Sequence, residues 1–477
     1  MITFLIIFTL VVGFYMLWNM GANDVANSMG TSIGSGAITL KQALIIAALL
    51  EFAGAFLLGS NVSETIQNGI IDPMAFKDDP MILVLGMLSA LLGTALWLQV
   101  ATLCKWPVST THAIVGAVIG FGAIVSGVSS VKWSIVGTIA LSWVLSPSLS
   151  ALVAYFLFAF IQKKILHAYN PLLAAKRIAP ILVFFVLLTF VISTFADGLE
   201  NFDFYPSLPL VITIGLLIGF IGFLICHYAC ERINADARVN PVIAAKQEQQ
   251  LYSLGRAIKN LIRAKLASSG KISSQIGDVI VTVNEITEEV QDKTKWESHI
   301  SADYSAVEKI FGFLQVLSAC FVAFAHGAND VANAIGPISA ILELLKDPTN
   351  IIKLSSKIDI PVWLLLFGGA SIVIGLLTYG WRVIETIGSK ITMLTPTRGF
   401  SAEFGASITI LIASKLGMPI STTHAIVGAV LGIGLARGIS SLNFRLMRDI
   451  FLSWIITIPS AAIASILIFY LLKFLCL

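Results

Sequence analysis

Charged residues are scarce in this chain of 477 residues, of which only 12% are Asp, Glu, Lys or Arg. Soluble domains carry about 25% charged residues, so the shortage argues against a soluble fold. The formal net charge of +3 is too small to indicate a protein that binds nucleic acid. Hydrophobic residues make up 57% of the chain. They form many apolar runs of roughly 20 residues, the length that crosses a bilayer, so we expect an all-α polytopic membrane protein.

Cysteine is also rare, and its placement indicates neither a disulfide framework nor a zinc site. The five cysteines lack the spacings typical of metal sites, and most lie in apolar segments, where packed thiols are expected. Residues 2–18 are apolar but lack the basic start and the small-residue cleavage site of a secretory signal. We therefore expect this segment to be the first spanning helix.

The apolar runs predict about twelve membrane-spanning helices. They lie near residues 2–20, 40–60, 81–100, 110–127, 134–160, 179–195, 208–228, 308–328, 361–380, 401–415, 421–436 and 450–475. One long polar stretch, 232–306, interrupts them and contains no recognisable site.

Two parts of the chain share the same motifs. GANDVAN occurs at 21–27 and again at 327–333, and PVSTTHAIVGAVIG at 107–120 recurs as PISTTHAIVGAVLG at 419–432. Seven predicted spans separate the starts of the two parts, so the parts should cross the bilayer in opposite directions. Such inverted-topology repeats are frequent in secondary transporters, which bind substrate between the repeats, often through broken helices. Some channels also contain inverted repeats.

The repeats divide the chain into a first membrane repeat at 1–177, an inserted transmembrane hairpin at 178–231, a polar segment at 232–306 and a second membrane repeat at 307–477. Lys and Arg concentrate in alternate loops, which indicates the cytoplasmic side. They are Lys163, Lys164, Lys176, Arg177, Arg232, Arg238, Arg382, Lys390, Arg398, Arg437, Arg445 and Arg448. The opposite loops are richer in acid, at Glu64, Asp72, Asp78, Asp79, Asp197, Glu200 and Asp203. We expect a multi-pass protein of the cell (plasma or inner) membrane, with both termini outside and 232–306 in the cytoplasm.

Each GANDVAN copy places a carboxylate and two amides beside a long apolar run. Asn23 and Asn27 lie four residues apart on one helix face, next to Asp24, and the preceding glycine is expected to weaken the helix. The second copy repeats the set at Asn329, Asp330 and Asn333. An ionised Asp within a bilayer costs at least ~2.5–3.5 kcal/mol, so it needs a partner or water. Carboxylate and amide oxygens favour hard cations. Helix packing through small residues and Asn is the alternative, which explains the Asp poorly.

Both copies of the second motif, at 107–120 and 419–432, predict a helix start within the membrane. Pro107 and Pro419 interrupt apolar runs, and a proline followed by Ser or Thr fits a broken helix with an N-cap. The hydroxyl residues that follow are Ser109, Thr110 and Thr111 in the first copy and Ser421, Thr422 and Thr423 in the second. A helix start offers free N–H groups and about +0.5 of a charge, which suits an anion, and added hydroxyl donors suit a tetrahedral oxyanion. Capping without any ligand is the alternative.

Four single ionisable residues add further candidates. His112 and His424 follow the two triplets and are expected to be satisfied intramembrane donors, with proton carriage as the alternative. Glu51 and Glu403 are single acids in apolar runs, which indicates a role in binding a coupling ion or in gating. The sequence lacks a nucleophile elbow, a third zinc ligand at a familiar spacing and a nucleotide-binding loop. We therefore expect neither an enzyme nor a cofactor.

These residues resemble the inorganic phosphate transporter (PiT) family. The paired GANDVANS and GANDVANA signatures and the two P-[VI]-S-T-T-H segments carry the resemblance, which covers both membrane halves. It implies cation-coupled uptake of inorganic phosphate by twelve helices around a pseudo-twofold axis. It also implies transport roles for Asp24, Asp330, Glu51 and Glu403, and phosphate-facing helix starts at the two Ser-Thr-Thr triplets.

The charges at these positions favour symport. Two helix starts supply about +1, phosphate carries roughly −1.5 to −2, and Asp24 and Asp330 add two negative charges, so about two or three cations or protons must balance the site. We expect Na⁺ near Asp24 and Asp330, with H⁺ as the alternative coupling ion, and alternating access by rocking of the repeats. Three alternatives stay open: another oxyanion such as sulfate, a metal–phosphate complex as the substrate, and an anion channel. The sequence also allows the protein to form a homo-oligomer.

Overall fold

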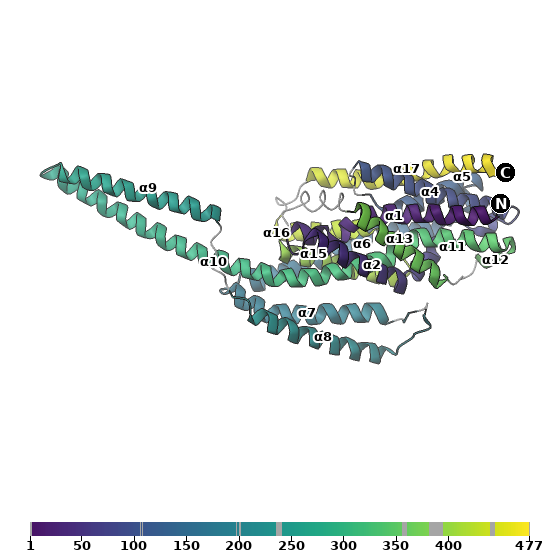
Figure 1. Cartoon of the computed structure of the whole chain (residues 1–477), viewed down its shortest axis with the longest axis horizontal. Coiled ribbons are helices and arrows are strands. Elements are labelled where there is room, and N and C mark those ends of the chain that lie inside the picture. The colour runs from purple at the N-terminus through teal and green to yellow at the C-terminus, as the bar shows by residue number, and fades with distance from the viewer. Residues whose placement is uncertain are drawn as a thin grey trace.

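The chain folds, in a computed structural model, into a bundle of long helices with two helical hairpins outside it (Figure 1). The structure describes residues 2–104, 106, 108–196, 198–199, 202–234, 241–354, 360–380, 395–438 and 444–476. Within these ranges, β pairing is limited to two isolated bridges. Some residues named above lie outside the described ranges: Pro107, Asp197, Glu200, Arg238, Arg382 and Lys390.

Long helices make up most of the described chain. They are α1 (Ile2–Gly34), α2 (Leu40–Leu58), α4 (Pro80–Leu103), α5 (Thr110–Val125), α6 (Trp133–Ile161), α7 (Pro171–Phe195), α8 (Leu208–Glu231), α9 (Pro241–Leu266), α10 (Lys271–Asp330), α11 (Ala332–Lys346), α13 (Val362–Tyr379), α15 (Pro396–Lys415), α16 (Thr422–Arg437) and α17 (Phe444–Cys476). The short pieces are α3 (Ser60–Glu64), α12 (Ile351–Leu354), π-helical turns at Thr65–Gly69 and Gln162–Leu166, and 3₁₀ turns at Pro73–Phe76, Val128–Ser130 and Pro348–Asn350.

Nine helical segments among the described residues are long and apolar enough to cross a membrane. They coincide with nine of the predicted spans, and α10 and α11 share one of these segments. The other predicted spans are also helical, but α5 and α16 have only 16 residues each. The third, α15, contains Arg398, Glu403 and Lys415. The all-α polytopic fold is thus confirmed, whereas the count of twelve spans stays a prediction.

The first GANDVAN copy lies within α1, whereas the second spans the end of α10 and the start of α11. The glycine is expected to weaken the helix, yet α1 runs through Gly21 without a break. In the second copy α10 ends at Asp330, three residues after Gly327, and α11 begins at Ala332. A Cβ atom on Gly21 would lie 2.1 Å from the carbonyl oxygen of Ile372, and one on Gly327 would lie 2.0 Å from that of Glu51. The glycines are therefore needed for close contact between helices, as small residues are in many membrane proteins.

The two halves of the chain are interlocked. Helix α1 packs against α13, and α2 packs against α10, so each contacts a helix from the other half. In the same way, α5 packs against α17, and α6 packs against α16. The largest buried apolar cluster lies among α1, α4, α5 and α11. This arrangement brings residues of the first and second motifs into the middle of one bundle.

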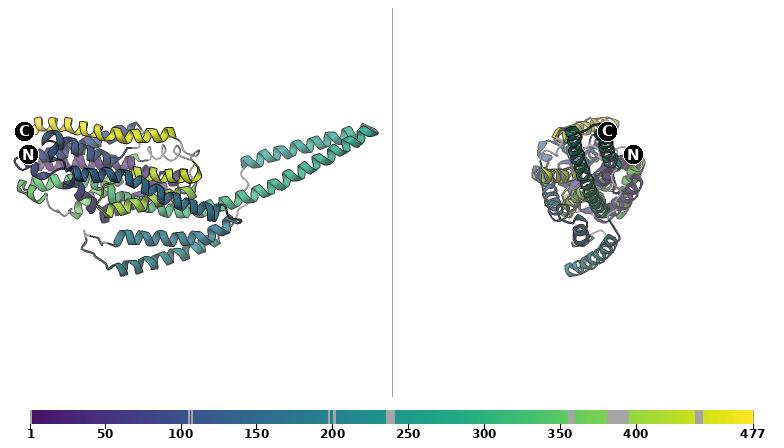
Figure 2. Two further views of the ribbon diagram at one scale, coloured as in Figure 1. Left: turned by 180° about the vertical axis from the view of Figure 1, so that it is seen from behind. Right: turned by 90° about the vertical axis from the view of Figure 1, so that its left-hand side faces the viewer.

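Two hairpins lie outside the bundle. Helices α7 and α8 pack mainly on each other and lie beside it, as two further views show (Figure 2). Helix α9 and the first part of α10 form the second hairpin, which projects from one end of the bundle. Helix α10, which is 60 residues long, continues from this hairpin into the bundle. Both termini lie at the opposite end, so the polar stretch and the termini are at different ends of the bundle.

Candidate functional site

The GANDVAN and Ser-Thr-Thr motifs meet between the two halves of the chain. Each GANDVAN copy contacts the Ser-Thr-Thr triplet of the other half. The amide of Asn27 on α1 donates to Oγ1 of Thr423 on α16 over 2.8 Å. Reciprocally, the amide of Asn333 on α11 donates to Oγ1 of Thr111 on α5 over 3.3 Å. These residues are far apart in sequence, and all of them are buried. The motifs therefore form one site rather than two.

The starts of α5 and α16 face each other at this site. Ser109 caps α5 by accepting from the backbone N–H of His112, and Ser421 caps α16 by accepting from that of His424, each over 3.2 Å. The hydroxyl of Thr111 donates to the carbonyl of Ile420, just before α16 (2.9 Å). The hydroxyl of Thr423 donates to the carbonyl of Val108, just before α5 (3.4 Å). Two positive helix ends thus converge on the same region.

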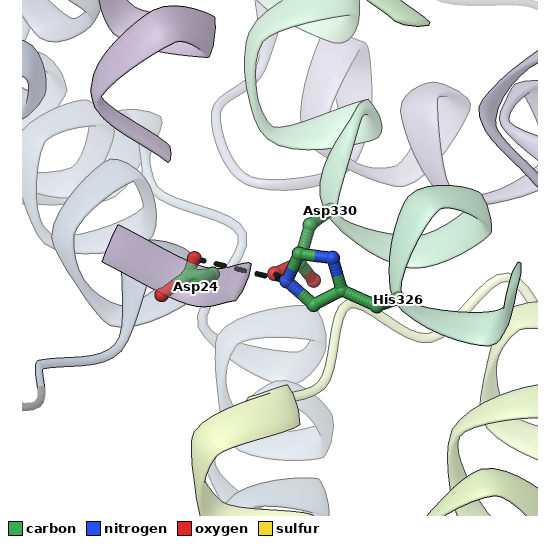
Figure 3. Close-up of side chains that lie close together, drawn as sticks. All are labelled: Asp24, His326 and Asp330. Carbon is green, nitrogen blue, oxygen red and sulfur yellow. Dashed lines mark ion pairs between the residues drawn. The ribbon is translucent and has the colours of Figure 1, made fainter. Parts of the chain in front are cut away.

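A histidine bridges three carboxylates at the centre of the site, and Figure 3 draws two of them with the imidazole. Nε2 of His326 lies 3.0 Å from Oδ2 of Asp330 and 4.0 Å from Oδ2 of Asp24. Its Nδ1 lies 3.4 Å from Oε1 of Glu51. All four side chains are at most 1% exposed. The structure therefore brings the predicted residues Asp24, Asp330 and Glu51 together around an imidazole that motif matching did not identify. A lone histidine in the apolar run AFAHGAND was the available signal.

Hydroxyl groups of the two helix starts contact the central carboxylates. Oγ1 of Thr422 donates to Oδ2 of Asp330 over 3.1 Å, and Oγ1 of Thr110 lies 3.5 Å from the same oxygen. On the other side, the amide of Asn27 donates to Oδ1 of Asp24 over 3.4 Å. The donors that suit an oxyanion and the acceptors that suit a cation are therefore in direct contact.

Several buried oxygens at the site have no hydrogen-bond partner among the described residues. They belong to three carboxylates and two amides: Oδ2 of Asp24, Oε2 of Glu51, Oδ1 of Asp330, Oδ1 of Asn329 and Oδ1 of Asn333. A buried oxygen without a partner costs about 1–3 kcal/mol, more if it is charged. Such a set of oxygens suits a hard cation. Ligand atoms of Asp24, His326 and Asp330 also lie within 4.8 Å of one another, close enough for one ion.

The remaining member of the first predicted motif, Asn23, is also buried, and its amide nitrogen has no partner among the described residues. Asn329, its counterpart, donates to Oγ of Ser414 over 3.1 Å and to the carbonyl of Met418 over 3.3 Å. Asn329 thus connects the second GANDVAN copy to the turn that precedes α16.

Glu403 lies in a separate polar cage. Its carboxylate accepts four hydrogen bonds, from Thr31 (2.5 Å), Ser32 (2.6 Å), Ser318 (2.6 Å) and Gln315 (3.2 Å). Thr31 and Ser32 follow Asn27 by about one turn of α1, so the cage adjoins the central site along that helix. Glu403 is fully buried but makes no described contact with Asp24 or Asp330. The structure therefore separates Glu403 from the other predicted acids.

His112 and His424 pack away from the carboxylates. Their ring centroids are 4.4 Å apart; His112 packs against Trp143 in a tilted arrangement, and His424 stacks on Trp454. Together they line a largely apolar cavity of about 540 Å³ beside α6 and α17. Nδ1 of His424 lies 3.2 Å from the carbonyl of Trp143, as expected for a satisfied histidine. Neither ring nitrogen of His112 has a hydrogen-bond partner among the described residues, which the sequence did not predict.

Comparison with known proteins gives a consistent result. A model of the phosphate transporter family matches residues 20–465. A protein of Chlamydia pneumoniae named as a phosphate permease is 42% identical over 472 residues, which is 98% of each chain. The chloroplast inorganic phosphate transporter 2-1 of Arabidopsis thaliana is 42% identical over 96% of this chain and 70% of its own length. A solved structure titled the sodium-dependent phosphate transporter is similar with a TM-score of 0.78 and 34% identity, over 99% of this chain and all of that chain (100%).

Proposed function

The chain belongs to the phosphate transporter family, and from this premise we propose that it carries inorganic phosphate across a membrane by symport with cations. The family is one of transporters and not of enzymes. Na⁺ is the favoured coupling ion, in keeping with the sodium-dependent phosphate transporter to which the chain is similar. H⁺ is the alternative.

The meeting of two helix starts with three buried carboxylates carries this proposal. Thr110 and Thr422 open α5 and α16, and both point their hydroxyls at Asp330. Each helix start contributes about +0.5 of a charge and free N–H groups. On phosphate binding, these hydroxyls turn to phosphate oxygens, together with those of Ser109, Thr111, Ser421 and Thr423.

Cation binding at the neighbouring oxygens balances the phosphate. Two helix starts supply only about +1, which leaves phosphate and the aspartates at roughly −3 without a cation. The oxygens of Asp24, Asp330 and Asn333 that lack a hydrogen-bond partner among the described residues are the Na⁺ ligands we assign at the centre. His326 positions these carboxylates, since one ring contacts all three acids. Phosphate and Na⁺ then stabilise each other in a buried site, which couples their transport.

Glu403 provides a second position for a coupling ion. Its carboxylate, with the hydroxyls of Thr31, Ser32 and Ser318, forms an oxygen-rich cage along α1. Hard cations favour such ligands. Because Thr31 and Ser32 follow Asn27 on the same helix, a cation at Glu403 lies next to the central site. The histidines His112 and His424 take part only if H⁺ replaces Na⁺.

Alternating access follows from an inverted-repeat arrangement, which we include in the proposal. A pseudo-twofold axis explains why Asn27 bonds Thr423 while Asn333 bonds Thr111. The repeats are then 1–177 and 307–477, with 178–231 as an inserted hairpin. Rocking of one repeat against the other opens the site to each side in turn. In this orientation the protein spans the cell (plasma or inner) membrane with both termini outside. The segment 232–306 lies on the cytoplasmic side.

Uptake of radiolabelled phosphate into proteoliposomes tests the proposal. We expect concentrative uptake when an inward Na⁺ gradient is imposed, and none when K⁺ replaces Na⁺. Uptake driven only by an inward H⁺ gradient would reassign the coupling ion. If neither gradient drives accumulation of phosphate inside the proteoliposomes, symport would be contradicted. Equal competition by sulfate would indicate a general oxyanion carrier, and ionic currents far above carrier turnover would indicate a channel.

A further inference from the structure

A pair of thiols lies near the end of α8, outside the bundle that holds the transport site. Cys226 and Cys230 are four residues apart, so they lie on the same face of the helix. Their sulfur atoms are 3.8 Å apart. Cys230 is only 3% exposed, and Cys226 is half-buried. Neither residue has a role in the proposed transport mechanism.

Helix geometry opposes a disulfide between these cysteines. Residues four apart on a helix have Cβ atoms about 5–6 Å from each other. A disulfide needs Cβ atoms about 3.5–4.5 Å apart. Oxidation of the pair would therefore require the last turns of α8 to unwind. The helix keeps two free thiols side by side.

The sulfur separation fits two ligands of one metal ion. A tetrahedral site with metal–sulfur bonds of about 2.3 Å places its sulfurs about 3.8 Å apart. The thiols of Cys226 and Cys230 already have this spacing with the helix intact. Thiolates select soft ions over the hard cations that the transport site favours.

Apolar side chains pack around Cys230, and a lysine of α7 lies close to the pair. Lys176 on α7 donates to the carbonyl of Glu231, one residue after Cys230, over 3.3 Å. Its ammonium group places a positive charge next to the thiolates that form when a metal binds. Cys226 is half-buried, so an ion can reach one of the two thiols without disrupting the helix.

We propose that Cys226 and Cys230 form a binding site for thiophilic ions such as Zn²⁺ and Cd²⁺, distinct from the phosphate and Na⁺ site. Binding replaces two S–H bonds by two metal–sulfur bonds and releases both protons to solvent. No electron is transferred in this step. The two thiolates supply two ligands, and water or a small thiol supplies the others.

Cadmium titration of the purified full-length protein tests this site. The ultraviolet charge-transfer band between thiolate and Cd²⁺ reports only sulfur ligands, so Cd²⁺ held by the central carboxylates does not contribute. We expect the band to saturate at one Cd²⁺ per chain. Cys226→Ser and Cys230→Ser should each abolish it, whereas the matched variants Cys104→Ser and Cys320→Ser should keep it.

Two results would overturn the proposal. One is a band of full intensity in either Cys226→Ser or Cys230→Ser, because a single thiol would then suffice. The other is the absence of a band in the reduced wild-type protein. Circular dichroism of each variant establishes that the helices are formed, so a lost band reports lost ligands. The assay needs no transport, and its outcome is independent of the coupling ion.

Discussion

Replacing Asp330 by Asn should weaken the binding of the Na⁺ that drives phosphate uptake. Asp330 is fully buried, and its Oδ2 lies 3.0 Å from Nε2 of His326 and 3.1 Å from Oγ1 of Thr422. Its Oδ1 has no partner among the described residues. Asparagine keeps the shape of the side chain but removes the charge, so the substitution tests the charge itself.

The expected size of the effect follows from the contacts of Asp330. An interaction with a charged group contributes about 1.5–3 kcal/mol. Loss of that amount from Na⁺ binding raises the half-saturating Na⁺ concentration by roughly 10- to 150-fold. The affinity for phosphate should fall as well, since a bound cation balances the anion.

The assay is the initial rate of phosphate uptake into proteoliposomes as a function of Na⁺ concentration. Asp79→Asn is the matched control, because exposed Asp79 caps α4 by accepting from the N–H of Met81 (3.1 Å) and Asn caps helices equally well. The control should behave as wild type. A half-saturating Na⁺ concentration for Asp330→Asn within about twofold of wild type, a difference of less than about 0.5 kcal/mol, would refute the assignment.

Three further substitutions test other parts of the site. Thr423→Val removes the acceptor of a 2.8 Å bond from the first GANDVAN copy, so the KM for phosphate should rise about tenfold, for about 1.4 kcal/mol. Gly327→Val adds atoms where a Cβ would already lie 2.0 Å from a carbonyl oxygen. It should lower the thermal unfolding midpoint, whereas Gly312→Val on the same helix, with open space around it, should not. His326→Gln should lower uptake at saturating Na⁺ by at least about tenfold per protein reconstituted, because glutamine cannot bridge three carboxylates.

Local patterns in the sequence predicted the elements well, for a physical reason. A bilayer demands apolar runs of about 20 residues, so composition alone locates the spans. The capping roles of Ser109 and Ser421 are confirmed, since each accepts from the backbone N–H three residues later. Capping is a local interaction, and its signal is therefore present within a few residues of sequence.

Contacts between residues that are far apart in the sequence cannot be predicted from a local pattern. The partners of Glu403 include Thr31 and Ser32, which lie 372 and 371 residues away. Nothing in the local pattern around Glu403 indicates that it lies apart from Asp24 and Asp330. The same holds for the close approach of Gly327 to the backbone of Glu51, which depends on the crossing of α2 and α10. Tertiary packing decides these positions.

His326 shows how repetition can hide an essential difference. Matching of the two halves selects residues that recur, yet His326 stands where the first copy has Met20. The rule that marks Glu51, an ionisable group inside an apolar run, applies equally to His326. A symmetric site would place Asp24 and Asp330 together without a basic group, whereas the imidazole contacts both, at 4.0 and 3.0 Å. The asymmetric residue therefore gives the symmetric acids a common partner, and identical motifs in the two repeats do not require identical roles.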